Sequence, residues 1–162
     1  MTSQRPDTEV SLATLFSDLI RVETRLYNAL DDRLKTELDS SLGRYEILDC
    51  VAAREKCRVH DVANTIAITV GAASKAVDRI EAAGLCVRTT DPGDRRSSHL
   101  TLTPAGEQLL ARARVVFEDE MRRRVAGVLS ADALYRLGAA LAPLRRSLEA
   151  DGTTGGTGRQ VR

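Results

Sequence analysis

The chain has 162 residues, which allows one domain with a substantial core and is too short for two. Its 24 basic and 23 acidic residues give a formal net charge of +1, so any argument for nucleic-acid binding depends on where the charges lie. The low aromatic content, 3%, disfavours the base stacking of proteins that bind RNA or single-stranded DNA. Because no apolar run approaches the roughly 18 residues of a membrane span, and no signal peptide is recognisable, we expect a cytoplasmic protein without a membrane partner.

The three cysteines, Cys50, Cys57 and Cys86, lack the paired short spacing of a zinc site, so we predict no metal and no cofactor. Cys50 and Cys86 lie within apolar patterns, which is typical of small core residues. Cys57 has three cations close to it in the sequence, which favour a thiolate and leave a redox role open. These cations are Arg54, Lys56 and Arg58.

The N-terminal part of the chain predicts one long helix after a short disordered segment. Residues 1–10 are polar and include Pro6, so we expect them to be disordered. Over residues 11–38 apolar side chains recur at steps of three and four, which is typical of an amphipathic helix. The apolar face is wide for a small domain, so we expect it to pack against a second copy as well as its own core.

Three further helices are predicted before residue 84. The second covers residues 42–54 and the third lies near residues 60–67. Only Ile68 and Thr69 then separate the third helix from the fourth, and so short a connection requires the steep crossing of a helix-turn-helix. The glycine usual in such a turn is missing.

The fourth helix carries the pattern of a DNA-reading helix. Thr69 is an N-cap candidate, and Gly84 is the expected glycine that ends the helix. The predicted buried positions are Val70, Ala73, Val77 and Ile80. The residues between them are small or polar near the helix start, followed by cations, and are Gly71, Ala72, Ser74, Lys75, Asp78 and Arg79. A helix with such a slim polar start can enter the major groove of DNA.

A β-hairpin is predicted directly after this helix. Residues 85–90 and 98–102 favour strands, and residues 91–94 have turn chemistry. Arg95 and Arg96 lie at or beside the tip. A charged hairpin tip is by itself a solvated loop, but after a recognition helix it is a wing whose arginine can reach the minor groove. Asp94 can hold one of these guanidinium groups in place.

The C-terminal part predicts two long helices. Thr103 and Pro104 together favour a helix start, and an apolar pattern then extends to residue 129. Ser130 is the predicted cap of the final helix, which has a leucine stripe and ends near residue 150. Residues 151–162 are expected to be a flexible tail.

This order of elements resembles the MarR family of bacterial winged-helix repressors over roughly residues 10–150. The motifs that carry the resemblance are Gly84-Leu85, the wing residues 91–96, and Leu102-Thr-Pro-Ala-Gly106, which matches the family's Leu-Thr-x-x-Gly. The resemblance implies a mainly α fold with a small β-hairpin wing. Its single domain, 11–150, has a winged helix-turn-helix lobe over 42–103, and the long helices of 11–38 and 104–150 serve dimerisation.

The resemblance also implies a homodimer that binds a palindromic operator in double-stranded DNA, with half-sites about 10 base pairs apart. Ser74 and Lys75 are then candidates for base edges or nearby phosphates, and Thr69 and Arg79 for backbone phosphates. Arg95 and Arg96 are both open as the residue that enters the minor groove, Arg96 being at the family's wing-arginine position. The full set of predicted DNA-binding residues is Thr69, Gly71, Ala72, Ser74, Lys75, Arg79, Asp94, Arg95 and Arg96.

Many relatives release DNA when a small organic effector binds in a crevice beside the dimerisation helices. For this chain a small organic effector and no effector at all both stay open. The candidates to line such a crevice are Phe16, Arg21, Tyr45 and His60, and each of them is more simply interpreted as a core or surface residue. Two other functions stay open: a winged helix that binds protein, and a redox-responsive regulator acting through Cys57. We expect no enzyme, because no nucleophile–base pair, carboxylate dyad or phosphate loop is present. The expected place of action is the cytoplasm, at the nucleoid when the protein is bound to DNA.

Overall fold

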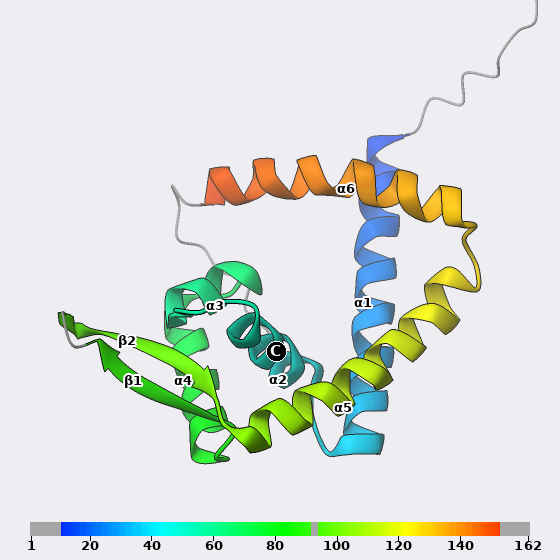
Figure 1. Ribbon diagram of the computed structural model, residues 1–162. Coiled ribbons are helices and arrows are strands. Elements are labelled where there is room, and N and C mark those ends of the chain that lie inside the picture. The colour runs from blue at the N-terminus through cyan, green and yellow to red at the C-terminus, as the bar shows by residue number, and fades with distance from the viewer. Residues whose placement is uncertain (1–10, 92–93, 153–162) are drawn as a thin grey trace, which may run out of the picture.

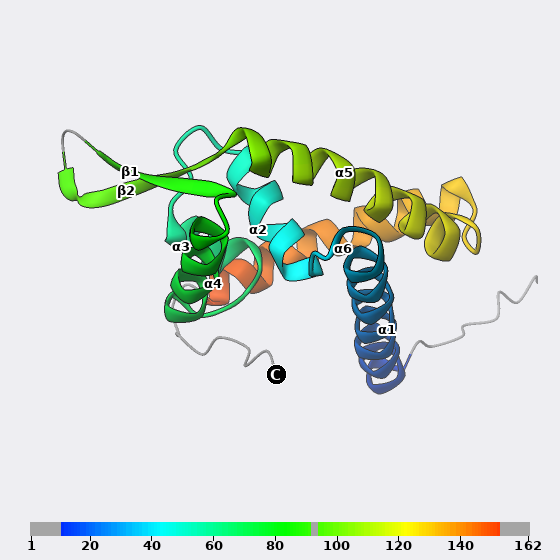
Figure 2. The same cartoon turned by 90° about the horizontal axis from the view of Figure 1, so that it is seen from below.

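The computed structural model describes residues 11–91 and 94–152, and for residues 91, 94–97 and 151–152 it describes the backbone alone (Figure 1). The segments predicted to be disordered, 1–10, and flexible, 153–162, lie outside the described residues. Figures 1 and 2 both show a β-hairpin projecting from one end of the molecule and a long N-terminal helix at the other. The fold is mainly α with one hairpin, as predicted.

The first two helices begin and end close to the predicted positions. Helix α1, Leu12–Leu38, begins after Ser11, whose hydroxyl accepts a hydrogen bond from the N–H of Thr14. It ends at Asp39, which has φ of 50°, a left-handed conformation that aspartate tolerates. Helix α2, Leu42–Ala52, is capped by Ser41 and is buried on most sides.

The helix-turn-helix is formed by α3, Val59–Thr65, and α4, Val70–Ala82. Helix α3 ends two residues before its predicted end, so four residues, 66–69, make the turn rather than two. Ala67 has φ of 55° in this turn. It therefore takes the left-handed conformation for which glycine is the usual residue, and this explains how the turn forms without one.

The wing is a two-stranded antiparallel sheet of β1, Cys86–Asp91, and β2, Asp94–Leu102. Cys86 pairs with Leu102 at its base and Thr90 with Ser98 further out, and the register shifts between Thr90 and Asp91. The sheet begins directly after Gly84, whose φ of 71° lets the chain reverse at the end of α4.

The C-terminal helices differ from the prediction in one respect. Helix α5, Pro104–Met121, continues into a π-helical segment, η1, Arg122–Ala126, before α6, Ala131–Gly152. The helices before and after the turn are bent by 106° relative to each other. In the described chain no single helix is long and apolar enough to cross a membrane, and only α5 with η1 and α6, taken together as a bent pair, reach that length and composition.

One hydrophobic core joins α2, α3, α4, β2 and α5 to the C-terminal half of α1. Its fully buried side chains include Leu34, Leu48, Val62, Val77 and Leu100, each from a different element. Helix α6 contributes no residue to this core among its described side chains. The N-terminal half of α1 and the length of α6 instead expose large apolar side chains, namely Leu12, Leu15, Phe16, Leu19, Ile20, Val22, Tyr135, Leu137, Leu141, Leu144 and Leu148.

Candidate nucleic-acid interface

Helix α4 separates its buried face from its exposed face as its sequence predicts. Ala73, Val77 and Ile80 are buried in the core. Gly71, Ala72, Lys75 and Arg79 are exposed and Ser74 is half-buried, whereas Val70 is 49% exposed and is not the core residue that was predicted. Val70 is the first residue of the helix, where no preceding turn covers it. The helix thus presents small side chains near its start and cations one and two turns later.

Thr69 has two roles at the start of α4. Its hydroxyl oxygen accepts a hydrogen bond from the N–H of Ala72 at 3.2 Å, which satisfies one amide of the first turn. The hydroxyl hydrogen can still be donated outward because a hydroxyl both donates and accepts. Thr69 is exposed, so its predicted phosphate contact is compatible with its capping role.

A residue that the sequence did not single out, Arg88, joins the wing to α4. Its Nη2 lies 2.6 Å from Oδ1 of Asp78, and its Nε lies 3.8 Å from Oε2 of Glu81. Its backbone N–H donates to Oε1 of Glu81 at 3.0 Å. These two ion pairs and one hydrogen bond fix the base of β1 against the last two turns of α4, so the helix and the wing form one unit.

A second joint connects the end of α4 to the start of α5, and the Leu-Thr-x-x-Gly motif forms it. The hydroxyl of Thr103 donates to the carbonyl of Gly84 at 2.6 Å and accepts from the N–H of Gly106 at 3.1 Å. Gly106 packs so closely that a Cβ there would lie 2.0 Å from the carbonyl oxygen of Leu85. The motif therefore attaches the unit of α4 and the wing directly to the long helix α5.

The predicted wing residues Asp94, Arg95 and Arg96 have their backbone in β2, and their side chains lie outside the described part of the structure. Their roles at DNA therefore stay predictions. The hairpin extends beyond α4 in both views, which brings its tip far from the helical body (Figures 1 and 2).

The four predicted effector residues lie on three different helices. Phe16 and Arg21 are exposed on α1, His60 is exposed on α3, and Tyr45 is buried on α2. The Tyr45 ring stacks on Phe117 with 4.8 Å between centroids, and burial raises the pKa of its hydroxyl. Tyr45 thus has a core role in the described chain.

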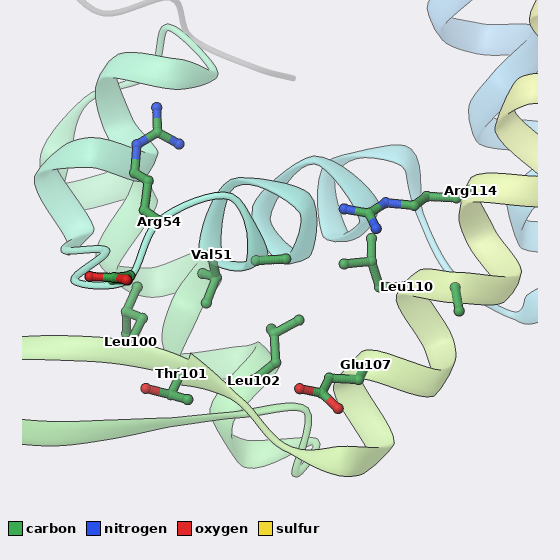
Figure 3. Close-up of a pocket in the computed structure, with 11 residues that line it drawn as sticks. Val51, Arg54, Leu100, Thr101, Leu102, Glu107, Leu110 and Arg114 are labelled. Carbon is green, nitrogen blue, oxygen red and sulfur yellow. The ribbon is translucent and has the colours of Figure 1, made fainter.

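An open hollow of about 330 Å³ lies elsewhere, between the end of α2, β2 and the start of α5. None of the four predicted residues lines it. In Figure 3 the apolar side chains of Val51, Leu102 and Leu110 lie between Arg54 and Arg114. Arg114 is held by Asp49, with 2.7 Å between Nη2 and Oδ1.

All three cysteines are buried, and Arg54 contacts Cys50 rather than Cys57. Nη1 of Arg54 lies 3.2 Å from Sγ of Cys50 rather than contacting Cys57, whose thiol has a raised pKa because it shares a hydrogen bond with Cys50 and is buried. The activation of Cys57 by Arg54, which the sequence left open, is therefore not what the geometry shows, because this cation contacts Cys50. Among the residues that the structure describes, no group of three His, Cys, Asp or Glu side chains is placed to hold a metal ion.

Comparison with known proteins finds the same architecture. Residues 41–98 match the model described as MarR family. AbsC, a MarR family transcriptional regulator from Streptomyces coelicolor, is 24% identical, with 92% of this chain and 99% of AbsC covered and a TM-score of 0.78. Sco3205, a MarR family transcriptional regulator from the same organism solved in complex with DNA, is 24% identical, with 86% and 93% covered and a TM-score of 0.78.

A third similar structure is CouR from Rhodococcus jostii RHA1, bound to p-coumaroyl-CoA. It is 23% identical, with 88% of this chain and 96% of CouR covered and a TM-score of 0.73. Among curated protein sequences, none matches this chain.

Proposed function

The chain belongs to the MarR family, and from this we propose that it is a transcriptional regulator, acting as a repressor, that binds a palindromic operator as a homodimer. The family model covers α2, the helix-turn-helix and most of the wing, and the same fold then extends over α1, α5 and α6. The proposal assigns α4 to the major groove and a wing arginine to the minor groove.

The observation that carries the proposal is the single unit formed by α4 and the wing. Lys75 and Arg79 are exposed on α4, and Lys75 makes no ion pair with any described residue. The Arg88 contacts hold the wing at a fixed angle beside this face. Contact with two neighbouring DNA grooves requires a fixed spacing between the helix and the hairpin, whereas a solvated loop needs no such fixing.

The exposed apolar faces of α1 and α6 support the homodimer. Phe16 is 67% exposed and Leu148 is 63% exposed, and both belong to a set of large apolar side chains on these two helices. Monomeric soluble proteins rarely leave so large a contiguous apolar surface in water. A second copy with the same exposed faces is the simplest cover, and its two-fold symmetry places two α4 helices at successive major grooves.

A small organic effector is the second part of the proposal. CouR, one of the similar structures, is bound to p-coumaroyl-CoA, and we extend ligand response of this general kind to the present chain. The hollow beside Arg54 and Arg114 supports it, because a ligand there contacts both β2 and α5. Such a ligand can change the angle between the wing and the dimerisation helices.

The proposed function also has consequences for enzymatic activity and for where the protein acts in the cell. A regulator of this family acts by binding DNA and not by catalysis, so we propose no enzymatic activity. Its operator lies in the chromosome, so we propose that it works in the cytoplasm and is associated with the nucleoid when bound.

The experiment that tests the function is titration of the purified chain against the DNA that flanks its own gene, over a range of salt and with excess competitor DNA. The proposal expects a complex that resists competitor and protects a palindrome. A winged helix that binds protein instead gives weak complexes that competitor removes at every salt concentration, together with no protected site.

A further inference from the structure

Two buried sulfur atoms lie next to each other where α2 is connected to α3. Sγ of Cys50, on α2, is 4.0 Å from Sγ of Cys57, which precedes α3. Both side chains are buried, and the proposed DNA interface uses neither. Cys86 is equally buried but has no sulfur neighbour among the described residues, so the Cys50–Cys57 pair has a feature that burial alone does not explain.

A cation and a hydroxyl contact Cys50, whereas the polar contact of Cys57 besides Cys50 is the carbonyl of Arg58, 3.8 Å from its sulfur. Nη1 of Arg54 is 3.2 Å from Sγ of Cys50, and Oγ1 of Thr65 is 3.5 Å from it. The hydrogen bond with Cys57 lowers the pKa of Cys50 most, and Thr65 and Arg54 lower it further against the effect of burial. The contacts with Arg54 and Thr65 therefore favour Cys50 over Cys57 as the sulfur that loses its proton.

Residues that contact or adjoin the Cys50–Cys57 pair line the surface hollow of Figure 3. Val51, which follows Cys50 in the sequence, and Arg54, whose guanidinium contacts the Cys50 sulfur, both line this hollow. Leu100 also lines it and donates its N–H to the carbonyl of Cys57 at 2.7 Å. Arg54, whose Nη1 contacts the Cys50 sulfur, is itself exposed to solvent.

We propose that Cys50 and Cys57 form a reversible intramolecular disulfide when a small hydroperoxide oxidises the protein. The Cys50 thiolate attacks one peroxide oxygen, so that an S–O bond forms, the O–O bond breaks, and an alcohol or water leaves after taking a proton. The Cys57 sulfur then attacks the Cys50 sulfenic acid, the S–S bond forms, and water leaves with the Cys57 proton. Two thiols lose two electrons in all, and one hydroperoxide is reduced.

Disulfide formation moves the joint between α2, β2 and α3. The two sulfurs must approach from 4.0 Å to about 2.05 Å, and the turn of residues 53–56 gives the chain room to do so. Cys57 pulls on Leu100 through its carbonyl, and the next residue, Arg58, donates its N–H to Asp61 at the start of α3. We expect a fall in operator affinity between about 5-fold and 150-fold, the usual range of such coupling. This consequence rests on the proposed function, whereas the disulfide itself does not.

The first test uses the full-length wild-type protein and hydrogen peroxide. After oxidation, alkylation and trypsin digestion, we expect the thiol count to fall from three to one. Trypsin cleaves after Arg54 and Lys56, so the disulfide appears as two joined peptides containing Cys50 and Cys57, with Cys86 alkylated. Retention of all three thiols, a bond to Cys86, or a bond between subunits overturns the proposal.

Variants then separate the chemistry from its effect on DNA. Cys57→Ser should stop at a Cys50 sulfenic acid that dimedone traps, and the matched control Cys86→Ser should form the disulfide as wild type does. Operator affinity of wild type and Cys86→Ser should fall on oxidation and recover with dithiothreitol, whereas that of Cys57→Ser should stay unchanged. If Cys57→Ser does not fold, the wild-type peptide map and affinity still decide.

The outcomes also separate this proposal from the proposed function. A disulfide without any change in affinity overturns the regulatory role, and no disulfide overturns the site. Reduced protein that binds no operator overturns the proposed function alone, because the peptide map is read without DNA.

Discussion

Arg88 at the base of the wing and Asp78 on α4 form an ion pair with 2.6 Å between Nη2 and Oδ1. The backbone N–H of Arg88 also donates to Glu81 at 3.0 Å, so one residue of β1 is attached to two successive turns of α4. Two points of attachment fix the angle between the wing and α4, whereas a single point would allow the wing to rotate about it. We therefore regard the pair as the element that positions the wing relative to the recognition helix.

Replacing Arg88 with Gln should lower operator affinity while changing stability little. Asp78 is 53% exposed, and ion pairs at such positions contribute about 0–1 kcal/mol to the free energy of unfolding. Fluorescence anisotropy with operator DNA and urea denaturation measure the two effects. Asp78→Asn should cause a similar loss, and the double variant should lose no more than the larger single loss. Fully additive losses mean that the two residues do not act as a pair.

Lys75→Gln should weaken operator binding by about 1–3 kcal/mol, because it removes the exposed cation from the middle of the recognition helix. The size of the effect on specificity then identifies the contact. A phosphate contact gives uniform weakening and a salt dependence shallower by about one unit, whereas a base contact relaxes the preference at one position. Arg146→Gln on α6 removes an equal charge away from α4 and is the matched control. Equal losses from both variants rule out a specific role for Lys75.

Gly106→Ala should destabilise the fold by at least about 3 kcal/mol, because its Cβ would lie 2.0 Å from a backbone oxygen that cannot move aside independently. Gly71 is the contrasting glycine, since a Cβ there meets nothing within 4 Å. Gly71→Ala should raise the free energy of unfolding by about 0.5–1 kcal/mol and still lower operator affinity, because α4 then approaches DNA less closely. Denaturant unfolding and anisotropy test both. A stable Gly106→Ala protein contradicts the assigned packing.

Leu141→Glu should convert the dimer to a monomer and abolish cooperative operator binding. Leu141 is 40% exposed in one chain and belongs to the leucine stripe of α6 that we assign to the interface. Ala139, also exposed, lies about 160° away around the helix at 100° per residue, so Ala139→Glu is the matched control. Light scattering after size-exclusion chromatography measures the mass of each variant. Two dimers, or two monomers, contradict the assigned face.

Glu120 should make the stability of the protein depend on acid pH. Burial opposes its ionisation, but hydrogen bonds from Arg123, Arg124 and Arg33 outweigh burial and lower its pKa to about 2 from the ordinary 4.5. A lowered pKa means that the ionised form stabilises the folded state above about pH 4.5, and that this stabilisation is lost as the pH falls from there towards 2.

The variant Glu120→Gln isolates this effect. At neutral pH its free energy of unfolding should be lower than that of wild type by about 1–3 kcal/mol, because three arginines lose a charged acceptor. The difference should shrink as the pH falls below about 4.5. Denaturant unfolding at a series of pH values measures it, and a difference that stays constant with pH contradicts the role of the ionised carboxylate.

The sequence alone predicts local features of the fold well. Thr69, Gly84 and Thr103 each have a cap or turn role that depends on a few neighbouring residues, and the structure confirms all three. Periodicity also identifies the buried face of α4, because the same face of one helix packs on the core along its length.

Contacts between distant segments could not be predicted in the same way. The pairing of Arg88 with Asp78 and the proximity of Cys50 to Cys57 depend on how elements pack, and periodicity does not contain that information. Glu120 reads as a surface residue in an acidic run, yet it is 1% exposed because Arg33 reaches it from α1. The left-handed conformation of Ala67 could not be predicted either, because alanine, unlike glycine or asparagine, does not indicate a positive φ.

Selection of binding sites from a pool of random double-stranded DNA tests the central claim most directly, because it assumes no operator. A dimer that reads DNA through α4 and the wing should enrich an inverted repeat whose half-sites are about 10 base pairs apart. The Leu141→Glu monomer should fail to enrich it. Enrichment of no motif, or of a motif without two-fold symmetry, would contradict the account.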